Sequence, residues 1–312
     1  MHYLITGGGG FIGTHLTLRL LEQGDEVSVL DNFSASENRL RGTKARIIKG
    51  SVLDRELVFS AASECHRIIH LAAVVGVRLA MSRGRETLKV SYLGSENVLE
   101  AASKLEKEIF IASSSAIYGK ILHTPVSEGE DSLLGPTYKG SWLYSVGKLI
   151  EEHLALAYFR ELGTRVKIGR FFNVIGPYQV ERYGMVVPTF VSRALRGEPL
   201  LMYGSGRQTR TFVYVEDALD GLEILLEKGA PGEIYNIGGT EEISIRELAE
   251  KIKALTGSSS AIKIIPYTEA FDEQFEETQR RAPDITRLQK LGYRPRYTLE
   301  ETLKKIIAHH MR

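Results

Sequence analysis

The amino-acid sequence predicts an α/β fold: a doubly wound parallel sheet of the Rossmann type with a smaller C-terminal lobe. Three observations support this prediction. Short apolar runs alternate with amphipathic helical patterns up to about residue 172, a glycine cluster joins the first run to the first helix, and the alternation then lapses. We therefore expect a Rossmann domain over residues 1–172 and a second lobe mainly over 173–312, with a strand near 233–237 joining the first domain.

Each expected strand is a short run rich in Ile, Val and Leu, and each expected helix shows apolar residues at helical spacing. The strands are expected at residues 3–6, 26–30, 46–48, 67–71, 108–112, 166–169, 210–214, 234–237 and 262–265. The helices are expected at residues 11–23, 82–105, 142–162, 187–196 and 216–227. Parallel strands joined by helical crossovers place ligands beyond the carboxyl edge of the sheet.

Composition sets broad limits on function. A net charge of +1 provides no global field for nucleic acid or an acidic membrane surface, so neither is expected as a partner. Cys65 is the single cysteine, which excludes internal disulfides and cysteine-based metal clusters, and no metal site is expected. The sequence shows no leader segment and no apolar run of membrane-spanning length, so the default expectation is a cytoplasmic protein.

The glycine cluster at residues 7–10 and 13 lies between the first strand and the first helix. Gly7 can turn with positive φ, Gly10 lets backbone N–H groups approach a phosphate, and Gly13 lets the helix sit close to the sheet. Phe11 and Ile12 open the helix, whose N-terminus attracts an anion. The cluster therefore predicts a pyrophosphate site for a dinucleotide.

Asp31 closes the second strand, about 20 residues after the glycines, where an acid holds the ribose 2′-hydroxyl of NAD. Its carboxylate would repel the 2′-phosphate of NADP, and Asn32 rather than an arginine follows it. NAD is therefore the expected cofactor. The alternative interpretation is an ordinary glycine-rich turn with a surface carboxylate.

Tyr144 and Lys148 lie at i and i+4, on one face of an expected helix. A phenol is a poor base at neutral pH, but a neighbouring cation favours its phenolate. Ser114 lies at the end of the fifth expected strand, where its hydroxyl can bond a substrate hydroxyl while Tyr144 takes the proton. Taken singly, the pair also fits a solvated helix face, and the serine fits an ordinary turn.

Together, the glycine cluster, the Ser-Ser-Ser-Ala-Ile-Tyr-Gly stretch at 113–119, the Tyr144/Lys148 pair and Arg-Phe-Phe-Asn-Val at 170–174 resemble the extended short-chain dehydrogenase/reductase family. The resemblance is to its branch of NAD-dependent nucleotide-sugar epimerases and dehydratases. It implies that Ser114, Tyr144 and Lys148 are catalytic. The cofactor-binding residues that it implies are Gly7, Gly10, Phe11, Ile12, Gly13, Asp31, Asn32, Val52, Leu71, Ala72, Ala73, Ser91, Tyr144 and Lys148. The substrate-binding residues that it implies are Asn173, Val186, Tyr203, Arg210 and Arg281, with the two arginines on the diphosphate.

Four positions depart from the family pattern. Ser51 and Ser91 replace an Asp and an Asn that are usual near the cofactor. Ala116 stands where related dehydratases and decarboxylases carry a Glu, and Ser141 stands where the decarboxylase branch carries an Arg. Since a methyl group cannot move a proton, the expected activity is 4-epimerisation of a UDP-linked hexose or hexuronate through a 4-keto intermediate. The alternatives are a UDP-glucuronate decarboxylase, an NDP-sugar 4,6-dehydratase and, outside catalysis, a protein that only binds NAD.

The resemblance also implies a homodimer, because two long helices of the family pack across a twofold axis. Such a face would use Val90, Leu93, Val98, Ile150 and Leu154, although burial within one subunit also explains these apolar positions.

Overall fold

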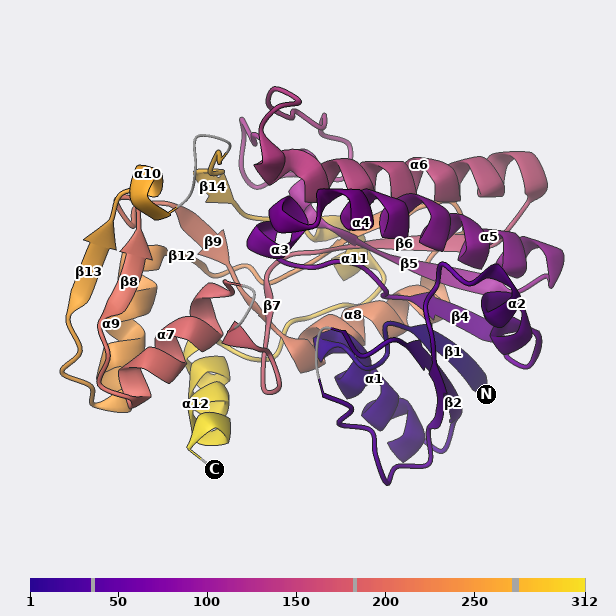
Figure 1. Ribbon diagram of the computed structural model, residues 1–312, viewed down its shortest axis with the longest axis horizontal. Coiled ribbons are helices and arrows are strands. Elements are labelled where there is room, and N and C mark those ends of the chain that lie inside the picture. The colour runs from indigo at the N-terminus through magenta and orange to yellow at the C-terminus, as the bar shows by residue number, and fades with distance from the viewer. Residues whose placement is uncertain (35–36, 182–183, 271–274, 312) are drawn as a thin grey trace.

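The computed structural model describes residues 1–34, 37–181, 184–270 and 275–311. Its main sheet is built from β1 (His2–Thr6), β2 (Glu26–Asp31), β3 (Arg46–Lys49), β4 (Arg67–His70), β5 (Glu108–Ser114), β6 (Val166–Phe171) and β11 (Ile234–Ile237). Among the described residues, these seven strands pair in parallel in the order β11-β6-β5-β4-β1-β2-β3. Figure 1 labels β6, β5, β4, β1 and β2 of this sheet. The chain winds outward in both directions from β1 and β4, which confirms the predicted fold class.

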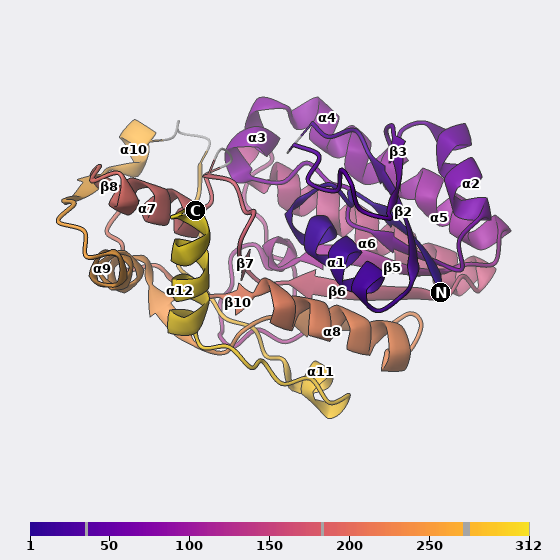
Figure 2. The same ribbon diagram turned by 90° about the horizontal axis from the view of Figure 1, so that it is seen from below.

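Helices cover both faces of this sheet (Figures 1 and 2). One face carries α2 (Arg55–Ser63), α5 (Ser95–Lys104) and α6 (Leu143–Leu162), and the other carries α1 (Phe11–Glu22), α8 (Val215–Lys228) and α11 (Thr286–Lys290). The segment before α5 contains α3 (Val77–Ser82), α4 (Gly84–Lys89) and the π-helical turn η1 (Val90–Gly94). The 3₁₀ turns η2 (Ser115–Tyr118) and η3 (Gly140–Trp142) follow β5 and precede α6.

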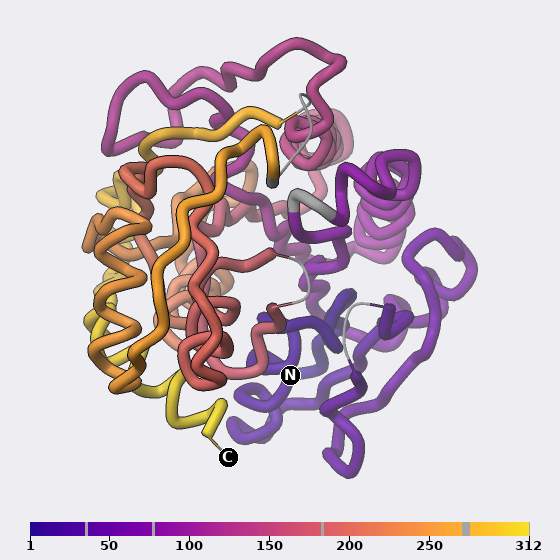
Figure 3. Tube along the Cα trace, turned by 60° about the vertical axis from the view of Figure 1, so that its left-hand side comes forward, coloured from indigo at the N-terminus to yellow at the C-terminus, as the bar shows by residue number. Residues whose placement is uncertain are grey.

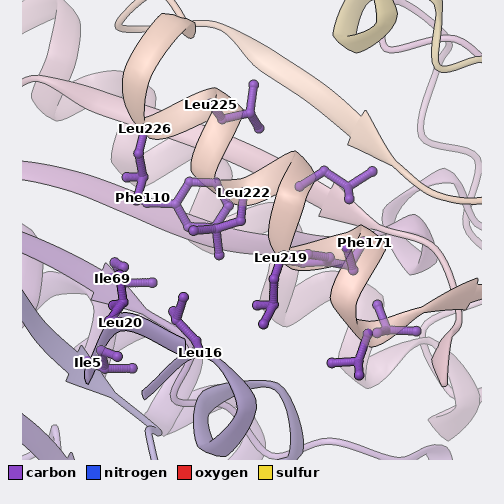
Figure 4. Close-up of a cluster of buried hydrophobic side chains, with 14 of the residues drawn as sticks. Ile5, Leu16, Leu20, Ile69, Phe110, Phe171, Leu219, Leu222, Leu225 and Leu226 are labelled. Atoms are coloured by element: carbon purple, nitrogen blue, oxygen red, sulfur yellow. The ribbon is translucent and has the colours of Figure 1, made fainter. Parts of the chain in front are cut away.

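The core exists because successive strand residues face opposite sides of the sheet and both sides are buried. Leu4 belongs to the apolar cluster beneath α2, α5 and α6, whereas Ile5 belongs to the cluster beneath α1 and α8. The second cluster contains Phe110 of β5 and Leu222 of α8 (Figure 4). This double burial explains why the strands read as continuous apolar runs.

The smaller lobe has its own core around Phe190, Leu248 and Leu303. It is built from β7 (Val174–Ile175), α7 (Val186–Leu195), β8 (Leu200–Tyr203), β9 (Thr209–Thr211), β10 (Val213–Tyr214), β12 (Glu242–Ser244), α9 (Ile245–Thr256), β13 (Ile262–Ile265), α10 (Tyr267–Ala270), β14 (Arg280–Arg281) and α12 (Leu299–His310). Figure 3 shows its red-to-yellow segments beside the indigo and purple N-terminal half.

Three of the expected elements differ in the structure, and the helices α2, α9 and α12 were not among those expected. The helix expected over 82–105 is interrupted at Arg83, whose backbone is not helical (φ −124°, ψ 41°), and again by η1. The strand expected over 210–214 divides at Phe212, so that β9 pairs with β12 and β14 while β10 pairs with β7. Helix α8, expected in the second lobe, packs on the main sheet beside the returning strand β11.

The expected dimer face is only partly available. Val98 is fully buried in the subunit's own core, and Val90 and Leu154 pack against that core. Leu93 and its neighbour Tyr92 remain 39% and 49% exposed. The homodimer therefore stays a prediction, with Val98 removed from its face. No helix in the described part of the chain is long and apolar enough to cross a bilayer.

We expect Leu222→Ala to lower the free energy of unfolding by about 2–5 kcal/mol, because it leaves a cavity between α8 and the sheet. Urea denaturation followed by circular dichroism measures this change. Leu162→Ala, at a 63% exposed position, is the control and should change stability by less than about 0.5 kcal/mol. Equal effects of the two substitutions would contradict the packing described for α8.

Candidate active site

A cavity of about 1100 Å³ lies beyond the carboxyl edge of the main sheet. Residues that follow β1, β2, β4, β5 and β6 line one side, and residues of the smaller lobe line the other. Because parallel strands end at a common edge, side chains far apart in the sequence meet there. The cavity is large enough for a dinucleotide together with a second ligand.

The glycine turn after β1 is shaped by close backbone contacts. Gly7 has φ of +72°, and a Cβ added there would lie 2.6 Å from the backbone nitrogen of Ala72. A Cβ on Gly13 would lie 2.4 Å from the carbonyl oxygen of Gly7. Helix α1 begins after Gly10 with no side-chain cap and no acid in its first turn. Its first N–H groups are therefore directed to an anion such as a pyrophosphate.

Asp31 closes β2 at the rim of the same turn. One carboxylate oxygen accepts a hydrogen bond from the Gly9 N–H (2.8 Å) and the other accepts from the Phe33 N–H (2.7 Å). Burial raises the pKa of Asp31 above its ordinary value, and these two N–H groups oppose that rise. The carboxylate is thus held at the position expected to receive a ribose hydroxyl.

The three expected catalytic residues line one cavity but come from two elements. Ser114 ends β5, and its Oγ accepts a hydrogen bond from the Ala116 N–H (3.2 Å). Tyr144 and Lys148 lie on the first turns of α6, one turn apart. The Tyr144 phenol lies within electrostatic range of the Lys148 ammonium and the Arg281 guanidinium.

The smaller lobe brings two arginines to the cavity. Arg210 pairs with Glu277 and donates to the Thr209 carbonyl (2.7 Å). Arg281 donates to the Thr278 hydroxyl (3.1 Å), while its buried Nε has no hydrogen-bond partner among the described residues. Burial and the neighbouring Arg210 lower the pKa of Arg281 to about 10. A half-buried guanidinium with a buried, unused Nε–H favours an anionic ligand.

Several cavity residues have no counterpart in the sequence motifs, and Glu276 is the most informative of them. Its carboxylate accepts from the Trp142 indole N–H (2.8 Å) and from the Lys120 ammonium (3.2 Å). Its backbone N–H donates to the Ser141 hydroxyl (3.2 Å). The Trp142 bond and the Lys120 charge hold the pKa of Glu276 below its usual range. Glu276 stands in a polar stretch with no local pattern, so only the tertiary fold reveals its position.

The cavity collects nearly all residues predicted to bind a ligand. Its lining includes Gly7, Gly10, Phe11, Ile12, Gly13, Asp31, Asn32, Val52, Leu71, Ala72, Ala73, Ser114, Tyr144, Lys148, Asn173, Val186, Tyr203, Arg210 and Arg281. Ser91 does not line it, because its side chain is buried against Gly147 of α6. The roles of the individual residues stay predictions. Among the described residues, no group of three or more His, Cys, Asp or Glu side chains is placed to hold a metal ion.

The site fits NAD on structural grounds. The glycine turn would be filled by any Cβ, the N-terminus of α1 is uncapped, and Asp31 stands at the end of β2. This combination defines a Rossmann enzyme that binds a dinucleotide beside a second, anionic ligand.

Comparison with known proteins gives the family. The model of the NAD dependent epimerase/dehydratase family matches residues 3–238, and the chain belongs to that family. Its cofactor is NAD, and it is an enzyme that modifies nucleotide sugars.

Three relatives illustrate the range of activities. A UDP-N-acetyl-alpha-D-glucosaminuronate decarboxylase of Bacillus cytotoxicus is 39% identical over 97% of this chain and 96% of its own. UDP-glucuronic acid decarboxylase 1 of Xenopus tropicalis is 36% identical over 99% of this chain and 72% of its own. The crystal structure of a UDP-glucose 4-epimerase of Thermotoga maritima is 29% identical, with a TM-score of 0.91 over 100% of this chain and 99% of its own.

We expect the protein to bind NAD in preference to NADP, because the Asp31 carboxylate accepts from a 2′-hydroxyl and repels a 2′-phosphate. Isothermal titration calorimetry with both dinucleotides, on protein freed of cofactor, measures the difference. Asp31→Asn should reduce the difference between the two affinities, because it weakens NAD binding and removes the charge that repels the 2′-phosphate of NADP. Equal affinity of the unaltered protein for the two dinucleotides would show that Asp31 does not face the ribose.

Proposed function

We propose that the protein is a decarboxylase of UDP-linked hexuronates, which removes the carboxyl group on C5 of the sugar as carbon dioxide. The proposal rests mainly on the position of Arg281. Its guanidinium has an unused, buried Nε and lies within electrostatic range of Tyr144. Since C4 and C5 are adjacent atoms, a cation beside the residue that acts at C4 is placed for a carboxylate on C5.

This assignment differs from the sequence expectation in two ways. The resemblance assigned Arg281 to the diphosphate together with Arg210, whereas the proposal uses its electrostatic interaction with Tyr144 and assigns it to the sugar. The expected 4-epimerase activity rested on Ala116, which supplies no acid. The relatives at 39% and 36% identity are named as decarboxylases. These names support the decarboxylase, one of the alternatives to the expected 4-epimerase.

The proposed reaction begins at the C4 hydroxyl. Ser114 bonds that hydroxyl and Tyr144 takes its proton, while Lys148 and Arg281 stabilise the negative charge on the phenol. The glycine turn and Asp31 would hold NAD, which would supply the hydride acceptor for C4 and the hydride donor for the final reduction. The residues of this chain orient the sugar and hold the proton.

A sugar with a ketone at C4 and a carboxylate on C5 is a β-keto acid. The bond between C5 and the carboxyl carbon breaks, carbon dioxide leaves, and the electron pair moves into the C4 carbonyl. The resulting enolate oxygen is stabilised by the hydroxyl groups of Ser114 and Tyr144, and C5 then takes a proton from water. No step needs a carboxylic acid at residue 116. Loss of water would need both an acid and a base near C5 and C6, so Ala116 counts against a dehydratase.

A 4-epimerase is the second candidate, favoured by Ala116 and by the likeness to the Thermotoga maritima structure. Epimerisation needs only the Ser114 and Tyr144 pair and room for the ketone to turn over. When the sugar lacks a carboxylate, the diphosphate is the only anionic group of the substrate that could bond the Arg281 Nε. This is why we rank it second.

Incubation with UDP-glucuronate and UDP-N-acetylglucosaminuronate separates the two candidates. We expect products lighter by one carbon dioxide and, in deuterated water, one deuterium at C5, detected by mass spectrometry and NMR. UDP-glucose is the control substrate, because it lacks the carboxylate. Arg281→Gln should suppress decarboxylation, whereas Arg207→Gln, at an exposed position outside the cavity, should not. A 4-epimer of unchanged mass as the main product would overturn the proposal in favour of the epimerase.

We expect Tyr144→Phe to lower turnover by about 10² to 10⁴, because the ring is retained while the proton acceptor is lost. Binding of NAD should change little, since the glycine turn and Asp31 remain. Steady-state kinetics and calorimetry on the same preparation measure both quantities. Turnover near that of the unaltered protein would remove Tyr144 from the mechanism.

A further inference from the structure

A chain of buried polar side chains runs behind the cavity, from α6 to β4 and β1. Lys148 is 3% exposed, Glu151 is 1% exposed and His70 is fully buried. Only Lys148 of these three lines the cavity. Neither Glu151 nor His70 has a part in the proposed reaction, yet burying ionisable groups costs stability unless they are paired.

The Lys148 ammonium is held by two groups of its own chain. It donates to the Ala112 carbonyl oxygen at 2.7 Å and lies 2.6 Å from Oε2 of Glu151, one turn further along α6. An ammonium has three N–H groups. Within the described residues two are thus engaged, and the third is left for the cavity, where Tyr144 and the cofactor site lie.

The other side of Glu151 is held as well. Its Oε1 lies 3.4 Å from Nε2 of His70, and the Ser95 hydroxyl also bonds the carboxylate. Nδ1 of His70 lies 2.6 Å from the Thr6 hydroxyl. Burial and the Lys148 charge lower the pKa of His70 to about 3, so the imidazole is neutral. A proton on Nε2 then bonds the Ser95 hydroxyl oxygen (3.2 Å), the hydroxyl that in turn bonds Glu151, while Nδ1 accepts from Thr6.

The titratable groups near the ammonium lie on α6 and β4. Burial disfavours the charged form of Lys148, but Glu151, Tyr144 and Glu152 on α6 outweigh it and raise the pKa of the lysine. His70 on β4 is neutral. The Glu152 carboxylate is paired with another residue, because it accepts two hydrogen bonds from the Arg170 guanidinium, at 2.8 and 3.0 Å. Glu151 is therefore the counter-ion of Lys148.

We propose that Glu151 is a positioning residue: it fixes the Lys148 ammonium at the floor of the cavity, keeps it charged, and leaves a single N–H for the cofactor and Tyr144. His70, Ser95 and Thr6 in turn fix the carboxylate. The inference concerns NAD binding, which the family shares, and does not depend on decarboxylation.

The test measures NAD affinity by calorimetry on cofactor-free protein between about pH 6.5 and 9.5. In the unaltered protein the affinity should stay flat, because the ammonium remains charged throughout. In Glu151→Gln the buried ammonium loses its counter-ion. It should then release its proton within this pH window, because burial lowers the pKa of an unpaired lysine by up to about 3–5. If NAD binding needs the charged ammonium, the affinity is retained below the lowered pKa of Lys148. Above that pKa the affinity falls by about tenfold for each pH unit.

Two further variants separate charge, position and stability. Glu151→Asp keeps the charge on a shorter side chain, so its profile should stay flat at an affinity reduced at every pH. Glu108→Gln removes another buried carboxylate, paired with Lys167 and Arg67 on the strands of the main sheet, and should lower the melting temperature while leaving NAD binding unchanged.

A flat profile with unaltered affinity in Glu151→Gln would overturn the proposal, as would an equal slope in Glu108→Gln. If Glu151→Gln does not fold, Glu151→Asp decides, because unaltered NAD affinity in that variant contradicts the positioning role. Since no sugar substrate is needed, failure of the decarboxylation assay leaves this test intact.

Discussion

The parallel direction of all strands in the main sheet is the constraint on which the site depends. Parallel strands end at one edge, so Gly7 after β1, Asp31 in β2 and Ser114 in β5 reach the same cavity. The arrangement requires helical crossovers on both faces, and these bury both sides of every strand. Core and site are thus two consequences of one topology.

Close approach of backbones then shapes the cofactor end of the cavity. Helix α1 comes so near the turn after β1 that Gly13 has no room for a Cβ beside the Gly7 carbonyl. That contact aims the uncapped helix N-terminus at the position of a pyrophosphate. At the other end, the two lobes each contribute a cation. Lys148 of the main domain is paired with Glu151, whereas Arg281 of the smaller lobe has an Nε without a hydrogen-bond partner among the described residues and can bind a ligand.

The electrostatics distinguish two tasks for cations in this cavity. Lys148 is satisfied by its own chain, so its charge is permanent and available to the phenol. Arg281 is incompletely satisfied, so its charge favours an incoming anion. Arg210 lies between these cases, since Glu277 pairs with it and a diphosphate would have to compete with that carboxylate.

Local patterns in the sequence were enough to predict the sheet, the glycine turn, Asp31 and the Tyr144/Lys148 pair, because each depends on neighbours within a few residues or on the period of a strand or helix. Relations across long separations were decided only by the tertiary structure. It interrupts the helix expected over 82–105, packs α8 on the main sheet, buries Val98 and brings the Glu276 carboxylate to the Trp142 indole N–H. The same holds for Glu151, whose sequence position identifies only a charged helix residue. Its role as the counter-ion of Lys148 arises because α6 packs against β5 and β6 of the main sheet and both groups are shielded from water.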